Sequence, residues 1–165
     1  MKVLGALMLF LGALAAGLCA AARLRGRARQ LRELERTMAL AGYAIGRFRL
    51  STPALAGELA RSAPGMGAVL FARLAAALET RGERSLEELW QEAANGADCA
   101  AQPCLLAFGA VLGRYGAEEQ ARAAEHCRQE LDALAAQAAE NAARSGRVYV
   151  ALAAAAGAAA AIVML

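Results

Sequence analysis

The sequence LRELERTMALAGYAIGRF, residues 31–48, shows the pattern that recurs through most of this chain. Its apolar residues are spaced by 3, 4, 3, 4 and 3 positions: Leu31, Leu34, Met38, Ala41, Ile45 and Phe48. This spacing puts them on one face of an amphipathic helix of about five turns. We therefore predict a helix that buries this face against other helices.

Local signals divide the following sequence, up to residue 147, into more helices. A hydroxyl residue before proline at Thr52-Pro53 predicts a helix start, and Ser85 with Glu88 predicts a capping box. Glycine and proline interrupt the chain at Pro64-Gly65, Gly82, Asn95-Gly96 and Gly113. The apolar faces expected between these breaks are Leu55 and Leu59; Met66, Val69, Leu70, Leu74, Ala77 and Leu78; Leu86, Leu89 and Trp90; Leu105, Phe108 and Leu112; and Ala124, Cys127, Leu131, Leu134 and Ala138. No run alternates in the manner of a strand, so we predict an all-α bundle of about six helices.

Two uncharged apolar segments, residues 3–22 and 148–165, bracket this helical body. A helix needs about 20 apolar residues to cross a bilayer, and the second segment spans about 27 Å. We therefore predict an N-terminal transmembrane helix in residues 1–22, a helical domain in 23–147 and a C-terminal transmembrane helix in 148–165. Alanine contributes little to insertion, so a buried or surface-lying helix stays an alternative for the last segment.

Arginines flank both apolar segments on the side of the body. We call these residues the basic collar: Arg23, Arg25, Arg27, Arg29, Arg32, Arg144 and Arg147. Basic residues near membrane ends stay on the cytoplasmic side, which predicts a cytoplasmic body and a C-terminus on the far side. The collar also argues against a cleaved signal peptide, because arginines resist export. Snorkelling toward anionic lipids is the favoured role of the collar, ahead of a specific protein contact.

The charge balance does not favour a nucleic-acid partner. The chain has 18 basic and 15 acidic residues, for a net charge of +3. Six of the basic residues lie in the first 32 positions, and 12 arginines face all 15 acids in the remainder. The basic balance thus belongs to the membrane-facing collar, which carries no aromatic residues that could stack on bases.

Few residues have the types and spacing that catalysis requires. His126 is the only histidine and is expected to be solvated. The adjacent acids at Glu87-Glu88 and Glu118-Glu119 point about 100° apart on a helix, and each pair stands where negative charge compensates the helix dipole. Gly65 and Gly67 lack the lysine and the preceding strand of a phosphate loop. We predict no enzymatic activity, no cofactor and no small-molecule substrate.

The cysteines are considered as a possible zinc site. Cys99 and Cys104 are close in sequence, and Cys127 with His126 lies on a later helix. Cys127 falls on the apolar face while His126 points elsewhere, so the two cannot easily share a tetrahedral metal. We predict no metal and no disulfide, and we treat Cys19 as a small apolar residue.

The order of these features resembles the stage III sporulation protein AB family over essentially the whole chain. The shared features begin with the apolar start, the arginine-rich exit and Leu31-Arg32-Glu33-Leu34, and end with the apolar terminus 162–165. The motif positions between them are Leu34, Thr52, Pro53, Leu55, Trp90, Phe108, Gly109, Gly113 and Gln120. The chain departs from the family at Ala44, in its alanine-rich last segment and in its three body cysteines.

The resemblance implies a role in endospore formation. Family members are similar to the helical domain of the inner-membrane platform protein of type II secretion and type IV pilus systems. The resemblance further implies a scaffold in the mother-cell membrane around the forespore, which couples a secretion-type ATPase to extracytoplasmic ring components. Its partners would be membrane lipids, that ATPase and other membrane proteins of the complex. A two-anchor adaptor of another transport system and a secreted helical binding protein are the alternatives.

Overall fold

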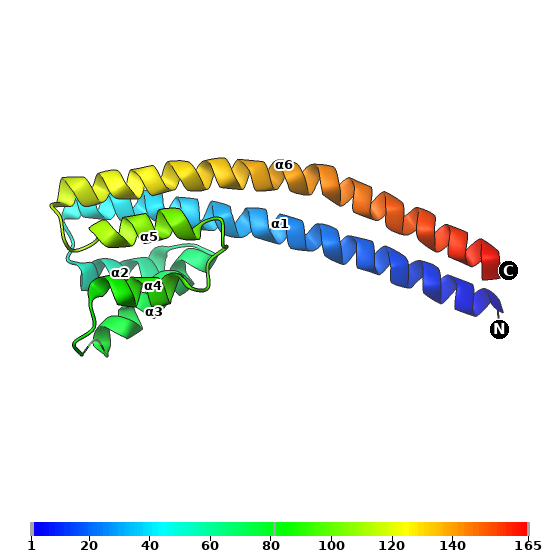
Figure 1. Ribbon diagram of the computed structural model, residues 1–165, viewed down its shortest axis with the longest axis horizontal. Coiled ribbons are helices and arrows are strands. Elements are labelled where there is room, and N and C mark those ends of the chain that lie inside the picture. Colours follow the sequence, from blue (N-terminus) through cyan, green and yellow to red (C-terminus); the bar gives the residue numbers. More distant parts are fainter. Residues whose placement is uncertain (1, 81, 165) are drawn as a thin grey trace. The chain divides into compact units, whose positions relative to one another are not determined.

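The computed structural model describes the backbone of residues 2–80 and 82–164, with side chains except those of 2–4, 6, 7, 9 and 160–164. Within these ranges the chain forms six α-helices and no strand (Figure 1). The helices are α1 (Lys2–Phe48), α2 (Thr52–Ser62), α3 (Gly65–Glu79), α4 (Leu86–Ala94), α5 (Gln102–Val111) and α6 (Ala117–Met164). The predicted all-α class is confirmed.

The first and last helices extend beyond the amphipathic stretches that the sequence predicted for the body. The helix predicted at residues 31–48 is the second part of α1, which runs over 47 residues, and α6 runs over 48. The terminal segments are therefore continuous with the first and last helices of the body. Neither helix contains proline, and a single glycine such as Gly26 costs a helix only about 1 kcal/mol.

Among the residues that the structure describes, no helix is both long and apolar enough to cross a membrane. The transmembrane helices predicted in 1–22 and 148–165 are therefore not supported. Parts of both predictions, at residues 1–4, 6, 7, 9 and 160–165, lie outside the residues whose side chains are described.

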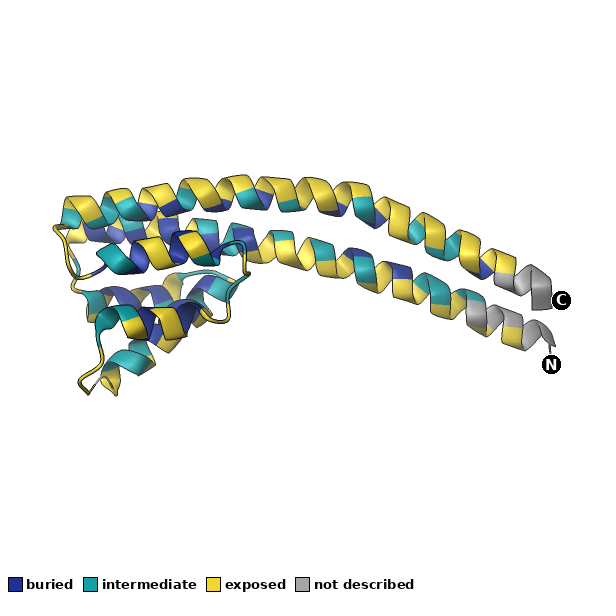
Figure 2. Ribbon diagram, in the orientation of Figure 1, coloured by how far each residue is buried: buried dark blue, intermediate teal, exposed yellow. Residues whose placement is uncertain are grey.

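The chain divides into two compact units. Residues 30–135 form the core unit, and residues 1–29 with 136–165 form the paired-helix unit. In the core unit α2 packs on α3, α3 on α4 and α4 on α5. Figure 2 shows the buried residues of these helices as dark blue bands facing inward. The largest side chains buried there are Trp90, Phe71, Phe108, Leu31, Leu34, Met38, Leu55, Leu59, Leu70, Leu74, Leu89 and Leu105.

Helix α1 is joined to α3 in the core unit by polar contacts as well as apolar ones. The Glu33 carboxylate accepts a hydrogen bond of 3.1 Å from the backbone N–H of Met66, near the start of α3. Thr37 is buried and donates to the Glu33 carbonyl at 2.7 Å. A methyl group on Gly67 would lie 1.8 Å from Thr37 Oγ1, so only glycine allows this approach of the two helices.

The capping box predicted at the start of α4 is confirmed. Ser85 Oγ accepts from the Glu88 N–H at 3.2 Å, and the Glu88 carboxylate accepts from the Ser85 N–H at 3.1 Å. The predicted Thr52 cap is wrong by one residue. Ser51 has the extended backbone of an N-cap and Thr52 is already helical, while Ser51 makes no side-chain capping bond.

Two residues predicted to face the core are exposed. Phe48 is 61% exposed and Val69 is 44% exposed. Phe48 is the last residue of α1, and the next residue, Arg49, adopts a left-handed backbone with φ 49°. The chain thus leaves the helix before a further turn could cover Phe48.

Small residues form the contact in the paired-helix unit. A methyl group on Gly17 would lie 2.6 Å from Ala153 Cβ, and one on Gly157 would lie 3.0 Å from Phe10 Cδ2. The sequence positions run in opposite directions along the two segments, which makes them antiparallel. Glycine lets two helix backbones come close together, which accounts for the short distances at Gly17 and Gly157.

Candidate functional site

The larger motif positions are core residues. Leu34, Leu55, Trp90 and Phe108 are each at most 1% exposed. Trp90 packs edge-to-face between Phe71 and Phe108, with ring centroids 5.5 and 5.3 Å away. Its indole N–H donates a 2.6 Å hydrogen bond to the Leu105 carbonyl. These positions stabilise the helical bundle and offer no group to a ligand.

Gly109 lies so close to Trp90 that no side chain fits between them. A methyl group on Gly109 would lie 2.0 Å from Trp90 Cδ1 and 2.6 Å from its Nε1. The absence of a side chain at Gly109 therefore lets α5 lie directly on the indole ring. Trp90, Phe108 and Gly109 form one packing arrangement between α4 and α5.

The other motif positions meet around one cavity of about 570 Å³. They are Thr52, Pro53, Gly109, Gly113 and Gln120, and they come from α2, α5, α6 and the turn after α5. Gly113 has φ +75°, and a methyl group there would lie 2.6 Å from Leu86 Cδ2. The structure thus brings together motif positions that are up to 68 residues apart in the sequence, Thr52 and Gln120.

Four of the polar side chains around this cavity, those of Gln120, Glu87, Arg114 and Ser85, make contacts within the chain. Gln120 Nε2 donates to the Tyr115 carbonyl at 2.6 Å, and Glu87 pairs with Arg114 at 3.2 Å. Ser85 is engaged in the capping box. We interpret the cavity as a junction of helix ends that fixes the arrangement of the bundle.

The basic collar is distributed over both units. Arg23, Arg25, Arg27 and Arg29 are exposed on the first part of α1, and Arg144 and Arg147 are exposed on α6. Arg32 belongs to the core unit, where it pairs with Asp132. Arg144 pairs with Glu140 at 2.8 Å, and Arg147 Nε donates to the Ala143 carbonyl at 3.0 Å.

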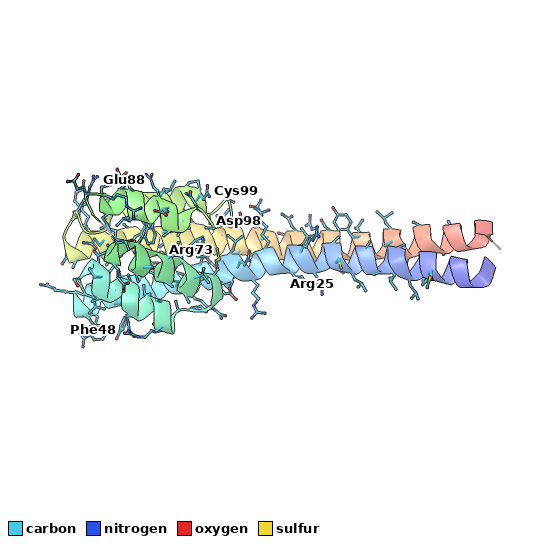
Figure 3. All side chains as sticks on the ribbon, turned by 90° about the horizontal axis from the view of Figure 1, so that it is seen from below. Arg25, Phe48, Arg73, Glu88, Asp98 and Cys99 are labelled. Carbon is cyan, nitrogen blue, oxygen red and sulfur yellow. The ribbon has the colours of Figure 1, made fainter. Side chains whose placement is uncertain are left out.

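Two collar residues from opposite ends of the sequence share a cavity in the paired-helix unit. Arg25 and Arg147 line a space of about 420 Å³ whose other lining residues are all alanines. The sequence predicted that both are membrane-flanking but gave no sign that they meet. Figure 3 labels Arg25 on this part of α1.

The histidine and the acidic pairs considered for catalysis or metal binding lie apart from one another. His126 is 73% exposed by side chain, and its Nδ1 lies 3.4 Å from Glu130. Glu87 and Glu88 stand in the first turn of α4, and Glu118 and Glu119 in that of α6, as predicted for dipole compensation. Within the described part of the chain, no three histidine, cysteine or acidic residues are grouped to hold a metal ion.

Two cysteines meet inside the core unit, which the sequence did not predict. Cys104 on α5 and Cys127 on α6 are both buried and form a hydrogen bond with each other. The Cys104 S–H also donates to the Ala101 carbonyl at 3.0 Å. The bond to Cys104 and then burial raise the pKa of the Cys127 thiol, which keeps it protonated. Cys99 is exposed.

An apolar groove lies between α1 and α2 in the core unit, with a volume of about 820 Å³. Its exposed walls include Leu40, Tyr43 and Phe48, which are 40%, 63% and 61% exposed. Tyr43 and Phe48 contact each other edge-to-face with ring centroids 5.7 Å apart. We call this feature the α1–α2 groove, and Figure 3 shows Phe48 at the outer edge of the unit.

Comparison with known protein families gives a match that covers almost the whole chain. The model of stage III sporulation protein AB matches residues 2–165. The chain belongs to this family. No curated protein and no solved structure gave a match. The resemblance inferred from the motif positions is thus confirmed, and the chain is a sporulation-associated protein of the stage III AB family.

The sequence periodicity predicted most of this family member's core, apart from Phe48 and Val69, but missed the α1–α2 groove. Leu40 and Tyr43 flank the buried positions Ala41 and Ala44 on α1, and these small residues leave room beside them. The sequence signal for the groove was the presence of apolar side chains, Leu40 and Tyr43, next to the predicted buried face of α1. That signal is weak, because single exposed apolar residues are common on protein surfaces.

Proposed function

We propose that this stage III AB family member is a membrane-attached scaffold of a secretion-like complex between mother cell and forespore. In this role the core unit binds a cytoplasmic secretion-type ATPase, and the terminal segments reach extracytoplasmic ring components. The observation that carries the proposal is the family match over residues 2–165, which includes both apolar termini as well as the helical body.

The continuity of α1 and α6 supports a coupling role. Each helix belongs partly to the core unit and partly to the paired-helix unit, with no break between them. Coupling of this kind requires no bond chemistry, and we expect none from this chain.

Membrane attachment in this proposal rests on the sequence. Residues 3–22 and 148–165 carry no charged side chain, and the basic collar flanks both. The collar arginines would lie at the cytoplasmic headgroups, where each basic residue contributes about 1 kcal/mol of attraction to anionic lipids. The body would then lie in the cytoplasm and Leu165 on the far side.

A pair of reporter fusions tests this arrangement. A reporter active only outside the cytoplasm should give signal when fused after Leu165 and none when inserted near Gly82. Replacement of Arg23, Arg25, Arg27, Arg29 and Arg32 by glutamine should mislocalise or invert the chain. Signal from the Gly82 insertion in the unaltered chain would contradict the proposal.

The coupling role is tested in sporulating cells. Loss of the chain should block spore formation, and the full chain should co-purify with a secretion-type ATPase. The matched control is His126→Ala, which should leave both unchanged because no proton transfer or metal binding is expected of His126. Normal spore formation without the chain would favour an adaptor of another transport system.

A further inference from the structure

The α1–α2 groove has the form of a helix-binding surface. It is a concave space of about 820 Å³ between two helices, lined mainly by apolar residues. Leu40, Tyr43 and Phe48 stand along it with 40–63% of their surface exposed. Grooves of this kind receive the apolar face of an amphipathic helix, whose anchors are spaced at i, i+3, i+4 and i+7.

The groove is bordered by positive charge. Arg36 precedes Leu40 by four residues and Arg47 follows Tyr43 by four, so both arginines flank the groove on the same face of α1. Both are exposed, and no ion pair joins either of them to a carboxylate among the described residues. On the α2 wall, Arg61 pairs with Glu58 at 2.7 Å. The charged residues that line the groove are thus one ion pair, and its excess positive charge comes from Arg36 and Arg47 beside the lining.

These charges discriminate between possible occupants. A second copy of the chain docked by the same surface would bring its own arginines toward Arg36 and Arg47, and like charges oppose such a contact. A partner with carboxylates at these points would be attracted instead. Positions 36 to 47 cover about 16 Å of α1, which equals three turns of a bound helix.

We propose that the α1–α2 groove binds an acidic amphipathic helix of a partner protein. The apolar face of that helix packs on Leu40, Tyr43 and Phe48, and carboxylates near its two ends pair with Arg36 and Arg47. This proposal rests on the proposed scaffold role in one respect: the partner is sought in sporulating cells.

The partner can be identified by photo-cross-linking from the groove in sporulating cells. The full chain carries p-benzoylphenylalanine in place of Tyr43, and the attached peptide is identified by mass spectrometry. The control carries the same group in place of Tyr115, which is 53% exposed and does not line the groove. We expect a peptide from another protein, with apolar residues at helical spacing and net negative charge, from position 43 only.

The charge requirement is tested on the same product. The double substitution Arg36→Glu and Arg47→Glu should abolish the cross-link. The charge-conserving double substitution Arg36→Lys and Arg47→Lys should retain it. A synthetic peptide of the captured segment should bind the full chain at least about tenfold more weakly after the charge reversal. Circular dichroism checks that each variant remains helical.

Several results would overturn the proposal. They are a cross-link to a second copy of this chain, a cross-link to lipid, no product from position 43, equal capture from position 115, and peptide affinity indifferent to the charge reversal. The scaffold role fails separately, if cells without the chain form spores normally. In that case an acidic helix captured at position 43 would still establish the groove as a docking surface.

Discussion

The carboxylate of Glu125 is held by donors from the next turn of α6. Arg128 donates through Nε at 2.8 Å and through Nη2 at 2.7 Å, and Gln129 donates through Nε2 at 3.1 Å. The bonds from Arg128 and then Gln129 lower the pKa of Glu125 from 4.5 to about 2. Arg128 also reaches Glu35 at 3.2 Å, so this cluster links α6 to α1.

We expect Arg128→Gln to raise the Glu125 pKa from about 2 toward 4.5, with Gln129 still donating to the carboxylate. A lowered pKa in the folded state stabilises the protein above the unfolded value, and this contribution is lost as the pH falls from about 4.5 toward 2. Because Glu125 is half exposed, the contribution is below about 1 kcal/mol. Carbon NMR titration of the carboxyl group measures the pKa directly.

The control for this titration is Arg122→Gln, which removes the partner of Glu118 about two turns earlier on α6. The Glu125 pKa should stay near 2 in that variant. An unchanged Glu125 titration in Arg128→Gln would show that the two side chains do not interact in solution.

Single residues differ in how far the sequence reveals their environment. Leu34, Leu55 and Trp90 were predicted as core residues correctly, because helical spacing determines which side of a helix is covered. The Cys104–Cys127 contact was not predictable, since it depends on how α5 lies against α6. The exposure of Phe48 was missed because periodicity cannot show that α1 ends at this residue.

At the scale of the element, α4 and α5 depend on each other through Gly109. Glycine is a poor helix residue, yet Gly109 lies inside α5 because Trp90 occupies the space where a side chain would stand. Alanine would improve helix propensity by about 1 kcal/mol but would place its methyl group 2.0 Å from the indole ring.

We expect Gly109→Ala to lower the free energy of unfolding by about 1–3 kcal/mol, the usual range for overpacking a core. Urea denaturation followed by Trp90 fluorescence measures the change. The control is Gly57→Ala in α2, where a methyl group meets no atom within 4 Å, and which should be neutral or stabilising. Equal stability of the two variants would show that α5 moves away from the indole without cost.

The helices themselves were largely predictable because their signals are local. The capping box at Ser85 and Glu88 was found from four residues of sequence. The start of α2 was placed one residue late, because Ser51 and Thr52 are both residues typical of caps and only backbone geometry separates them. Sequence could also not show which motif positions meet, since Thr52 and Gln120 come together through tertiary packing.

At the scale of the whole molecule, the chain forms two compact units whose boundaries lie inside its two longest helices, α1 and α6. The core unit begins at Gln30 and ends at Ala135, although α1 and α6 continue beyond both points. Sequence analysis had no signal for these positions, because no proline or turn residue marks them. The collar residues Arg23 to Arg29 consequently belong to the paired-helix unit.

We expect residues 30–135 to fold without the rest of the chain. The large buried side chains from Leu31 to Phe108 lie within this range, as do the ion pairs of Arg32 with Asp132 and of Arg128 with Glu35. Since Trp90 is the only tryptophan and is fully buried, its fluorescence reports the core directly. Urea should unfold the fragment in one cooperative transition, as is usual for single domains of this size. The Trp90 transition of the full chain should have a similar midpoint, because the contacts around the indole all lie inside the core unit. A fragment with a gradual transition, or with Trp90 exposed before urea is added, would show that the core requires the paired-helix unit.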